Sequence, residues 1–114
     1  MATVCLFCEI VQGTIPVKRV FEDDLSVAFA DLHPQAPVHL LVIPKEHLAS
    51  HAQAMAEHAA LLGHLMAVAG ELARSQGLRN GYRLVVNTGK DGGQTVGHLH
   101  VHLLGGREMG WPPG

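Results

Sequence analysis

Hydrophobic and polar positions change their period along the chain, and the changes outline strands around one long helix. Residues 17–21 and 26–30 read as two strands that flank an acidic turn at Glu22, Asp23 and Asp24, which is typical of a hairpin. Residues 38–43 form a continuous apolar run bracketed by prolines. Such a run predicts a third strand that is buried on both faces.

The second half of the chain switches to helical spacing and then returns to strands. Apolar residues recur at helical intervals over residues 53–76, and Gly77 stands where a left-handed C-cap is expected. Residues 82–87 and 98–104 predict a fourth and a fifth strand. The order of strands, one long helix and strands predicts an α+β domain with a mostly antiparallel sheet.

Length and composition favour one apolar domain. The 114 residues are predicted to form a single domain, 1–114, in which 47% of residues are hydrophobic and 16% are charged. With so little polar material, some apolar surface is expected to meet a partner. A net charge of -2 without a basic run argues against a binder of duplex nucleic acid.

The N-terminal apolar run is short. Residues 2–8 lack a basic segment before them and are too few to span a bilayer, so we expect neither a signal peptide nor a membrane helix, and the cytoplasm is the default location. Cys5 and Cys8 lie three positions apart, a spacing poorly suited to a disulfide. The pair is expected to bind a metal or to remain as free thiols.

The chain contains nine histidines, and three of them alternate with aliphatic residues near its end. A period of two places His98, His100 and His102 on one face of a strand, while the aliphatic residues between them face the core. Imidazole near neutral pH serves as ligand, nucleophile or proton carrier. Three consecutive choices of histidine on one face therefore indicate a site.

A glycine-rich loop, residues 87–97, directly precedes these histidines. Gly92 and Gly93 allow a backbone to approach an anion closely, and Gln94 and Thr95 offer neutral donors to phosphate oxygens. An imidazole nucleophile beside such donors suits attack on phosphorus.

With these motifs in view, the chain resembles the histidine triad superfamily of nucleotide hydrolases and transferases, over nearly its whole length from about Cys5. Segments 31–39, 41–45, 61–66 and 92–95, with the tail 104–114, are similar to its histidine triad nucleotide-binding branch. The resemblance implies a HIT-like fold: a five-stranded sheet with one long helix and a short N-terminal helix, extended across a homodimer. It also implies a purine nucleoside phosphoramidase that cleaves the phosphorus–nitrogen bond of adenosine or guanosine 5'-phosphoramidates.

The resemblance assigns roles residue by residue. His100 matches the nucleophile, His102 the contact to phosphate and leaving group, and His98 and His39 the residues that orient them. The matched nucleotide-binding residues are Asp31 for the ribose hydroxyls; Phe7, Ile10 and Leu32 for the base; Asn87, Gly93, Gln94 and Thr95 for the phosphate; and Trp111 of the tail. Asp31 could instead be a turn or capping residue. Catalysis is expected to require no cofactor.

Resemblance also suggests a structural zinc site formed by Cys5, Cys8, His47 and His98. The alternative is that both cysteines are reduced, buried apolar groups. The expected homodimer would use the long helix, where Ala67, Gly70 and Ala73 allow close approach, and each tail would reach the partner's site.

Two other functions stay open. One is a different reaction within the same superfamily, on dinucleoside polyphosphates or by nucleotidyl transfer. The other is a non-catalytic scaffold whose histidines hold a nucleotide or a metal.

Overall fold

A five-stranded antiparallel sheet forms the centre of the computed structural model, which describes residues 5–114. Its strand order is β1-β2-β3-β5-β4, so the predicted α+β class and antiparallel sheet are confirmed. The elements in chain order are α1 (Leu6–Gln12), β1 (Arg19–Glu22), β2 (Ser26–Ala30), β3 (Val38–Pro44), α2 (Ala59–Ser75), β4 (Tyr82–Val85) and β5 (Val101–Gly105). Residues 1–4 lie outside the described part of the chain. They include the first positions of the predicted domain and of the apolar run 2–8. Within residues 5–114, no helix combines the length and apolarity that a membrane crossing requires.

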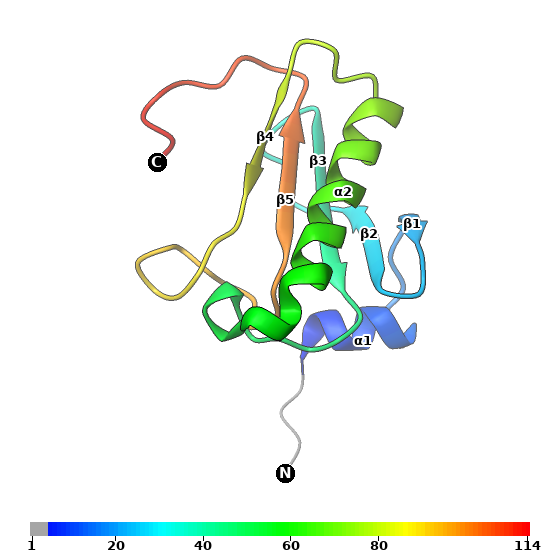
Figure 1. Cartoon of the computed structure of the whole chain (residues 1–114). Coiled ribbons are helices and arrows are strands. Elements are labelled where there is room, and N and C mark those ends of the chain that lie inside the picture. Colours follow the sequence, from blue (N-terminus) through cyan, green and yellow to red (C-terminus); the bar gives the residue numbers. More distant parts are fainter. Residues whose placement is uncertain (1–4) are drawn as a thin grey trace.

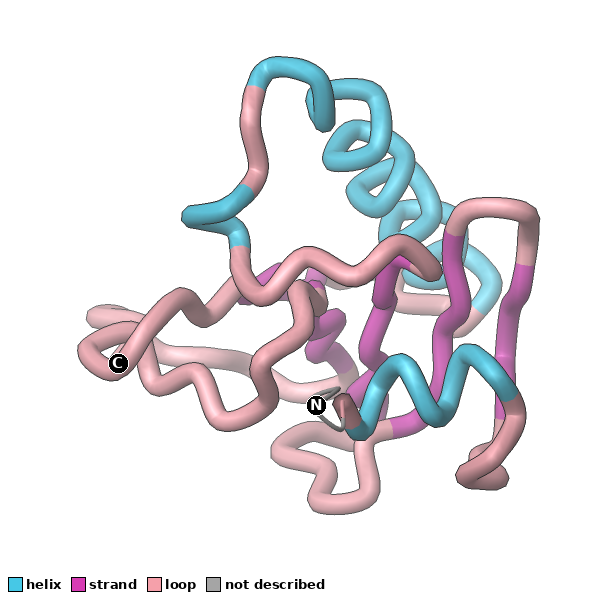
Figure 2. The backbone as a smooth tube through the Cα atoms, turned by 90° about the horizontal axis from the view of Figure 1, so that it is seen from below, coloured by secondary structure: helices cyan, strands magenta, loops and turns pink. Residues whose placement is uncertain are grey.

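The two helices cover opposite faces of the sheet, as the views in Figures 1 and 2 together show. Neighbouring residues of a strand point to opposite faces, so β3 serves both layers. Leu40 and Val42 pack in the cluster that contains α2, whereas Leu41 and Ile43 pack in the cluster that contains α1. The predicted burial of this strand on both faces is therefore confirmed.

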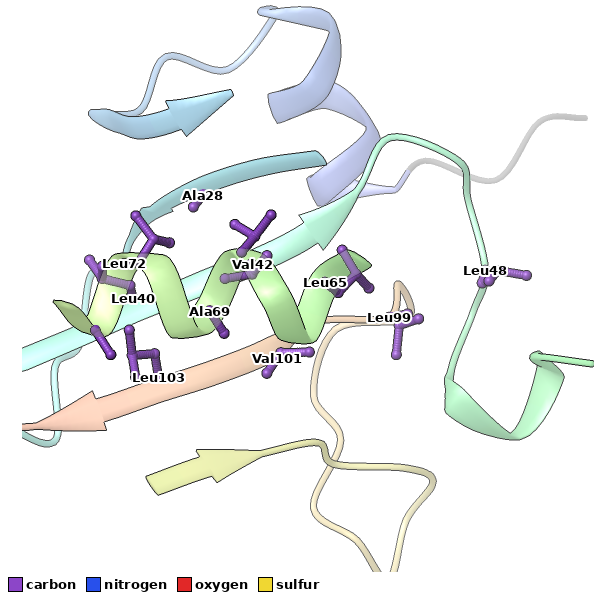
Figure 3. Packing of buried hydrophobic residues seen from close by; sticks show 12 residues of the cluster. Ala28, Leu40, Val42, Leu48, Leu65, Ala69, Leu72, Leu99, Val101 and Leu103 are labelled. Carbon is purple, nitrogen blue, oxygen red and sulfur yellow. The ribbon is translucent and has the colours of Figure 1, made fainter. Parts of the chain in front are cut away.

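The larger core lies between α2 and the sheet (Figure 3). Its members include the aliphatic partners of the histidine alternation, Leu99, Val101 and Leu103, as predicted. Ala73 also packs in this core with 2% of its surface exposed. It is therefore not available for the close helix approach that was expected of it.

The long helix begins later than predicted. Residues His51–Gln53 and Ala56–His58 form two short 3-10 turns, and regular α-helix starts at Ala59 instead of residue 53. Ala54 (ψ 130°) and Met55 (ψ -179°) are extended, which interrupts helical hydrogen bonding, and the main-chain N–H of Met55 donates to the His58 ring. The predicted end is confirmed, since Gly77 takes φ 72° after the last turn.

The fifth strand also begins later, at Val101 instead of residue 98. Its pairing with β3 ends at Val42 and Val101. Beyond that point the His98 ring donates to the carbonyl of Pro44 at 2.9 Å, and the N–H of Leu99 donates to Leu48 at 2.7 Å. These bonds replace the sheet ladder, so His98 and His100 lie in irregular chain before the strand begins.

Candidate functional site

The histidines gather on the sheet face that α2 leaves free. His102 lies opposite Leu41 in the β3–β5 register, and Leu41 belongs to the α1 side of the sheet. His39, on β3, reaches His102 with ring centroids 5.1 Å apart, and His100 lies 4.9 Å from His102. The predicted grouping on one face is thus present, with His98 and His100 buried and His102 half-buried.

The His100 ring is fixed by its own main chain. Its Nδ1 lies 2.7 Å from the carbonyl oxygen of His98. A carbonyl only accepts, so neutral His100 carries its proton on Nδ1 and keeps a lone pair on Nε2. Phe7 packs edge-on against the ring with centroids 5.2 Å apart, which limits its rotation. The free Nε2 lone pair is the arrangement a nucleophile requires.

His102 is fixed in the opposite sense through a chain of hydrogen bonds. The main-chain N–H of Gln35 donates to Nδ1 of His39 at 3.0 Å. His39 must therefore carry its proton on Nε2, which lies 2.9 Å from Nδ1 of His102. Because that nitrogen accepts, neutral His102 holds its own proton on Nε2. The two neighbouring rings thus offer one lone pair and one N–H donor.

The surroundings of His39 and His102 keep both rings neutral. Burial, followed by the proximity of His100 and His39, lowers the pKa of His102 to about 4, although Asp31 opposes the shift. Burial likewise lowers the pKa of His39, again against the effect of Asp31. At neutral pH the imidazoles of His102 and His39 are therefore uncharged, which agrees with the tautomers deduced from the hydrogen bonds.

Asp31 stabilises a turn, as the second interpretation of this residue predicted. Its Oδ1 accepts the main-chain N–H of His33 at 2.8 Å, and its Oδ2 lies 3.4 Å from Nε2 of His39. Asp31, His39 and His102 place ligand atoms close enough for a metal ion. The Gln35 N–H, however, occupies Nδ1 of His39 and forces the proton onto Nε2, where a metal would need a lone pair. These three residues are therefore poor metal ligands as arranged.

The glycine loop has a tighter structural role than its sequence suggests. A Cβ at Gly92 would lie 2.3 Å from the carbonyl oxygen of Thr88, and Gly93 takes φ 74°, so the turn itself requires both glycines. Gln94 was expected to donate to phosphate, but its Nε2 donates to the carbonyls of Ala49 (2.7 Å) and Val96 (2.9 Å). The Gln94 side chain therefore fixes the loop, because its donors are used within the protein.

Two further loop residues differ in availability. The Asn87 amide donates to the carbonyl of Gly92 at 2.7 Å and so closes the turn. Thr95, in contrast, is exposed beside the start of the histidine segment. Of the predicted phosphate donors, Thr95 is the one whose side chain faces solvent.

The residues matched to the base slot do not form one exposed group. Phe7 and Ile10 are buried together in the smaller core on the α1 side, with Val27, Phe29, Leu41 and Ile43. Leu32 stands outside that cluster, 83% exposed. Trp111 of the tail is also exposed, at 84%.

A second group of ligand-type side chains lies at the start of α1. Cys5, Cys8, His47 and His98 bring four ligand atoms within 4.8 Å of one another. Nδ1 of His98 lies 3.3 Å from Sγ of Cys5, 3.6 Å from Sγ of Cys8 and 3.1 Å from Nδ1 of His47. In a tetrahedral zinc site such edges are about 3.3 Å between nitrogens and about 3.6 Å between nitrogen and sulfur.

The tautomer of His98 also fits a cation. His98 donates from Nε2 to Pro44, so its lone pair on Nδ1 points at the sulfurs. Burial, followed by the Cys5 side chain, raises the pKa of the Cys8 thiol to about 11. Both sulfurs would need to lose protons to bind a metal, whose charge would favour the thiolates.

Sequence reasoning missed two features of the molecule. The motifs found in the sequence assign no role to His64, yet its Nε2 lies 2.6 Å from Oδ2 of Asp23 and links α2 to the β1–β2 turn. The main-chain N–H of Gln35 fixes the tautomer of His39, and no residue-type pattern reveals a backbone donor. The histidine count could have prompted a search for a carboxylate partner for His64.

Comparisons with known proteins agree with this geometry. Residues 12–109 match the family model described as HIT domain. An uncharacterized HIT-like protein of Synechococcus elongatus is 55% identical over 114 residues, with both chains fully covered. The crystal structure of a HIT family hydrolase from Legionella pneumophila has a TM-score of 0.96 at 52% identity, covering 97% of this chain and 100% of that one. A histidine triad nucleotide-binding protein from Candida albicans has a TM-score of 0.81 at 30% identity, covering 96% and 83%.

Proposed function

The chain belongs to the HIT domain family, and from this premise we propose that it is a purine nucleoside phosphoramidase. It would hydrolyse the phosphorus–nitrogen bond of adenosine or guanosine 5'-phosphoramidates through a nucleotide bound covalently to His100. The observation that carries the proposal is the hydrogen bond from Nδ1 of His100 to the carbonyl of His98, which leaves Nε2 free to attack. The resemblance to a structure named HIT family hydrolase supports hydrolysis in general.

The proposed reaction has two steps. The lone pair of Nε2 of His100 attacks phosphorus, the phosphorus–nitrogen bond breaks, and the leaving nitrogen takes a proton from solvent water to depart as the amine. A water molecule then attacks the same phosphorus and gives up its proton to solvent. The bond between phosphorus and Nε2 of His100 breaks, which releases the nucleoside monophosphate and restores neutral His100. The Nε2–H of His102 donates a hydrogen bond where negative charge develops on the phosphoryl group or the leaving atom.

Nucleotide contacts are proposed on the same face. Asp31, whose Oδ2 is not used in its turn, would accept from the ribose hydroxyls, while exposed Leu32 would contact the base. Thr95 would donate to phosphate from the end of the glycine loop. The likeness to a protein named histidine triad nucleotide-binding protein supports a nucleotide ligand.

A turnover assay tests this function directly. Hydrolysis of a fluorogenic adenosine phosphoramidate is compared with that of a diadenosine polyphosphate at equal concentration. We expect faster release from the phosphoramidate. Preference for the polyphosphate would assign the chain to the other reaction of the superfamily, and nucleotide binding without turnover of either compound would support the scaffold function.

We also propose that Cys5, Cys8, His47 and His98 hold one structural zinc ion. The ion would attach the start of α1 to His98, and no catalytic step depends on it. Support comes from the edge lengths and from the lone pair that His98 directs at the sulfurs. Metal analysis of protein purified without a histidine tag should find close to one zinc per chain. Fully reactive thiols with no metal would reject this site.

We propose that the chain forms a symmetric homodimer with a second copy of itself. Strand β4 is an edge of the sheet, and a surface cavity of about 310 Å³ beside it is lined by apolar residues that include Leu62, Met66 and Val86. A second copy would cover this area and bring Trp111 of its tail to the partner's site. Light scattering at micromolar concentration should give the mass of two chains, and the mass of one chain would contradict the dimer.

A further inference from the structure

The tail after β5 touches the loop that controls the His39 tautomer. Gly106 takes φ 91°, and a Cβ there would lie 2.9 Å from Cβ of Pro37, so the main chain of Gly106 packs closely against the Pro37 ring. Beside this contact, Nε of Arg107 donates to the carbonyl oxygen of Gln35 at 3.0 Å. The side chain of an arginine outside the triad therefore holds the residue whose N–H reaches His39.

We infer that Arg107 is a positioning residue that keeps the proton of His102 on Nε2, so that this ring presents an N–H donor to the site. It acts through the Gln35 main chain and His39 on His102. The inference about tautomers rests on these hydrogen bonds, and its consequence for turnover rests on the proposed phosphoramidase function.

Successive hydrogen bonds connect Arg107 to His102. Arg107 holds the carbonyl of Gln35, and the N–H of the same residue donates to Nδ1 of His39. With Nδ1 occupied, His39 carries its proton on Nε2 and donates to Nδ1 of His102. His102 must then keep its own proton on Nε2. Without the Gln35 donor, neutral His39 could carry its proton on Nδ1, and its free Nε2 would then accept a hydrogen bond from Nδ1–H of His102.

That reversal would place a lone pair on Nε2 of His102. The ring would then lose its donor to the phosphoryl group. Asp31 would also be affected, since its Oδ2 lies 3.4 Å from Nε2 of His39 and is a second acceptor for that proton. His100 would not change, because the carbonyl of His98 holds it independently. The predicted effect is therefore confined to two of the site's histidines.

Arg79 provides a matched control. It lines the same surface cavity as Arg107, of about 680 Å³, and its side chain is exposed. Within residues 5–114 the Arg79 side chain makes no hydrogen bond to the Gln35 loop. Arg79→Gln and Arg107→Gln thus remove the same charge from the same surface, and only the second removes the contact to Gln35.

Histidine tautomers are measured by two-bond proton–nitrogen correlation spectra, with the His39 and His102 signals assigned by their loss in His39→Gln and His102→Gln. The wild-type protein and Arg79→Gln should show both rings protonated at Nε2. Arg107→Gln should show mixed tautomers for these two rings and an unchanged His100. Its kcat should fall roughly 3- to 10-fold with little change in KM, because in mixed tautomers only part of the molecules lose the His102 donor in the transition state. Arg107→Lys, which keeps a donor, should recover part of the loss.

The outcomes separate this inference from the proposed function. Unchanged tautomers in folded Arg107→Gln would overturn the inference, whatever the activity. Shifted tautomers in a protein that turns over no phosphoramidate would uphold the relay and reject the function. If Arg107→Gln does not fold, the wild-type protein still tests the bond that the inference requires, through a nitrogen–nitrogen coupling across the Gln35–His39 hydrogen bond. Its absence, with fast exchange of the Gln35 amide, would also overturn the inference.

Discussion

The carbonyl oxygen of His98 accepts a hydrogen bond of 2.7 Å from Nδ1 of His100, two residues later. This contact ties the ring of one histidine to the backbone of another. The side chain of His98 meanwhile faces Cys5 and Cys8. His98 therefore connects the cysteine group to the position of His100.

Replacing His100 with Asn should abolish turnover while nucleotide binding remains. Asn has no nitrogen lone pair that can attack phosphorus, so kcat should fall by roughly three orders of magnitude or more. Quenched reactions with labelled substrate should trap a covalent nucleotide on the wild-type protein and none on the variant. His102→Asn should lose less, roughly 10²-fold, because it removes a hydrogen-bond contact but keeps the covalent route. A fully active His100→Asn protein would contradict the mechanism and favour the scaffold function.

The core between α2 and the sheet should dominate stability. Leu65 is 1% exposed, so Leu65→Ala should lower the free energy of unfolding by about 2–5 kcal/mol in urea denaturation. Leu25, in the β1–β2 turn, is 49% exposed and provides the same substitution at the surface. Leu25→Ala should cost about 1 kcal/mol or less. Equal losses at the two positions would mean that the helix does not pack as described.

Periodicity was sufficient for the architecture but not for the ends of elements. The alternation at residues 98–104 placed the histidines and leucines on the correct faces, because that pattern depends only on extended backbone. It could not show that regular pairing starts at Val101, since the Pro44 carbonyl is taken by the His98 ring. The predicted start of α2 was wrong for a similar reason, because the residue types at Ala54 and Met55 do not indicate that the backbone is extended there.

Some features of the candidate site were likewise predictable from the sequence and others were not. The sequence brings Cys5, Cys8, His47 and His98 together only by resemblance, and the structure places their ligand atoms within 4.8 Å. The tautomer of His39, in contrast, depends on a main-chain donor, the N–H of Gln35, which every residue type except proline carries. The use of Gln94 inside the loop was equally hidden, because an amide side chain suits either a phosphate or a carbonyl.

Two glycines should respond to alanine in opposite directions. Gly63 lies within α2, and a Cβ there meets nothing within 4 Å, so Gly63→Ala should stabilise the protein by about 0.5–1 kcal/mol. A Cβ at Gly92 would meet the Thr88 carbonyl oxygen at 2.3 Å, so Gly92→Ala should destabilise by about 1–3 kcal/mol. Thermal unfolding of both variants measures the difference. Equal melting temperatures would contradict the described loop backbone.

Stability should decrease in acid in two stages. The pKa of His102 is lowered from 6.5 to about 4, mainly by burial, so the unfolded chain binds its proton first. Stability from this residue is complete above pH 6.5 and is lost as the pH falls toward about 4. For Asp23, burial opposes the shift, but hydrogen bonds from Ser26, Leu25 and His64 lower its pKa from 3.8 to about 2. Its contribution is lost at lower pH, as the carboxylate is protonated between about 4 and about 2.

Denaturation in urea at a series of pH values separates the two stages. His102→Gln should flatten the dependence between pH 6.5 and pH 4, because glutamine does not titrate. Asp23→Asn should flatten it below pH 4 and weaken the link between α2 and the hairpin, since the amide binds the His64 ring less strongly than a carboxylate. His33→Gln, at an exposed loop histidine outside the triad, is the matched control and should keep the wild-type curve. If His102→Gln retained the full slope between pH 6.5 and pH 4, the burial of His102 would not be the source of the acid sensitivity.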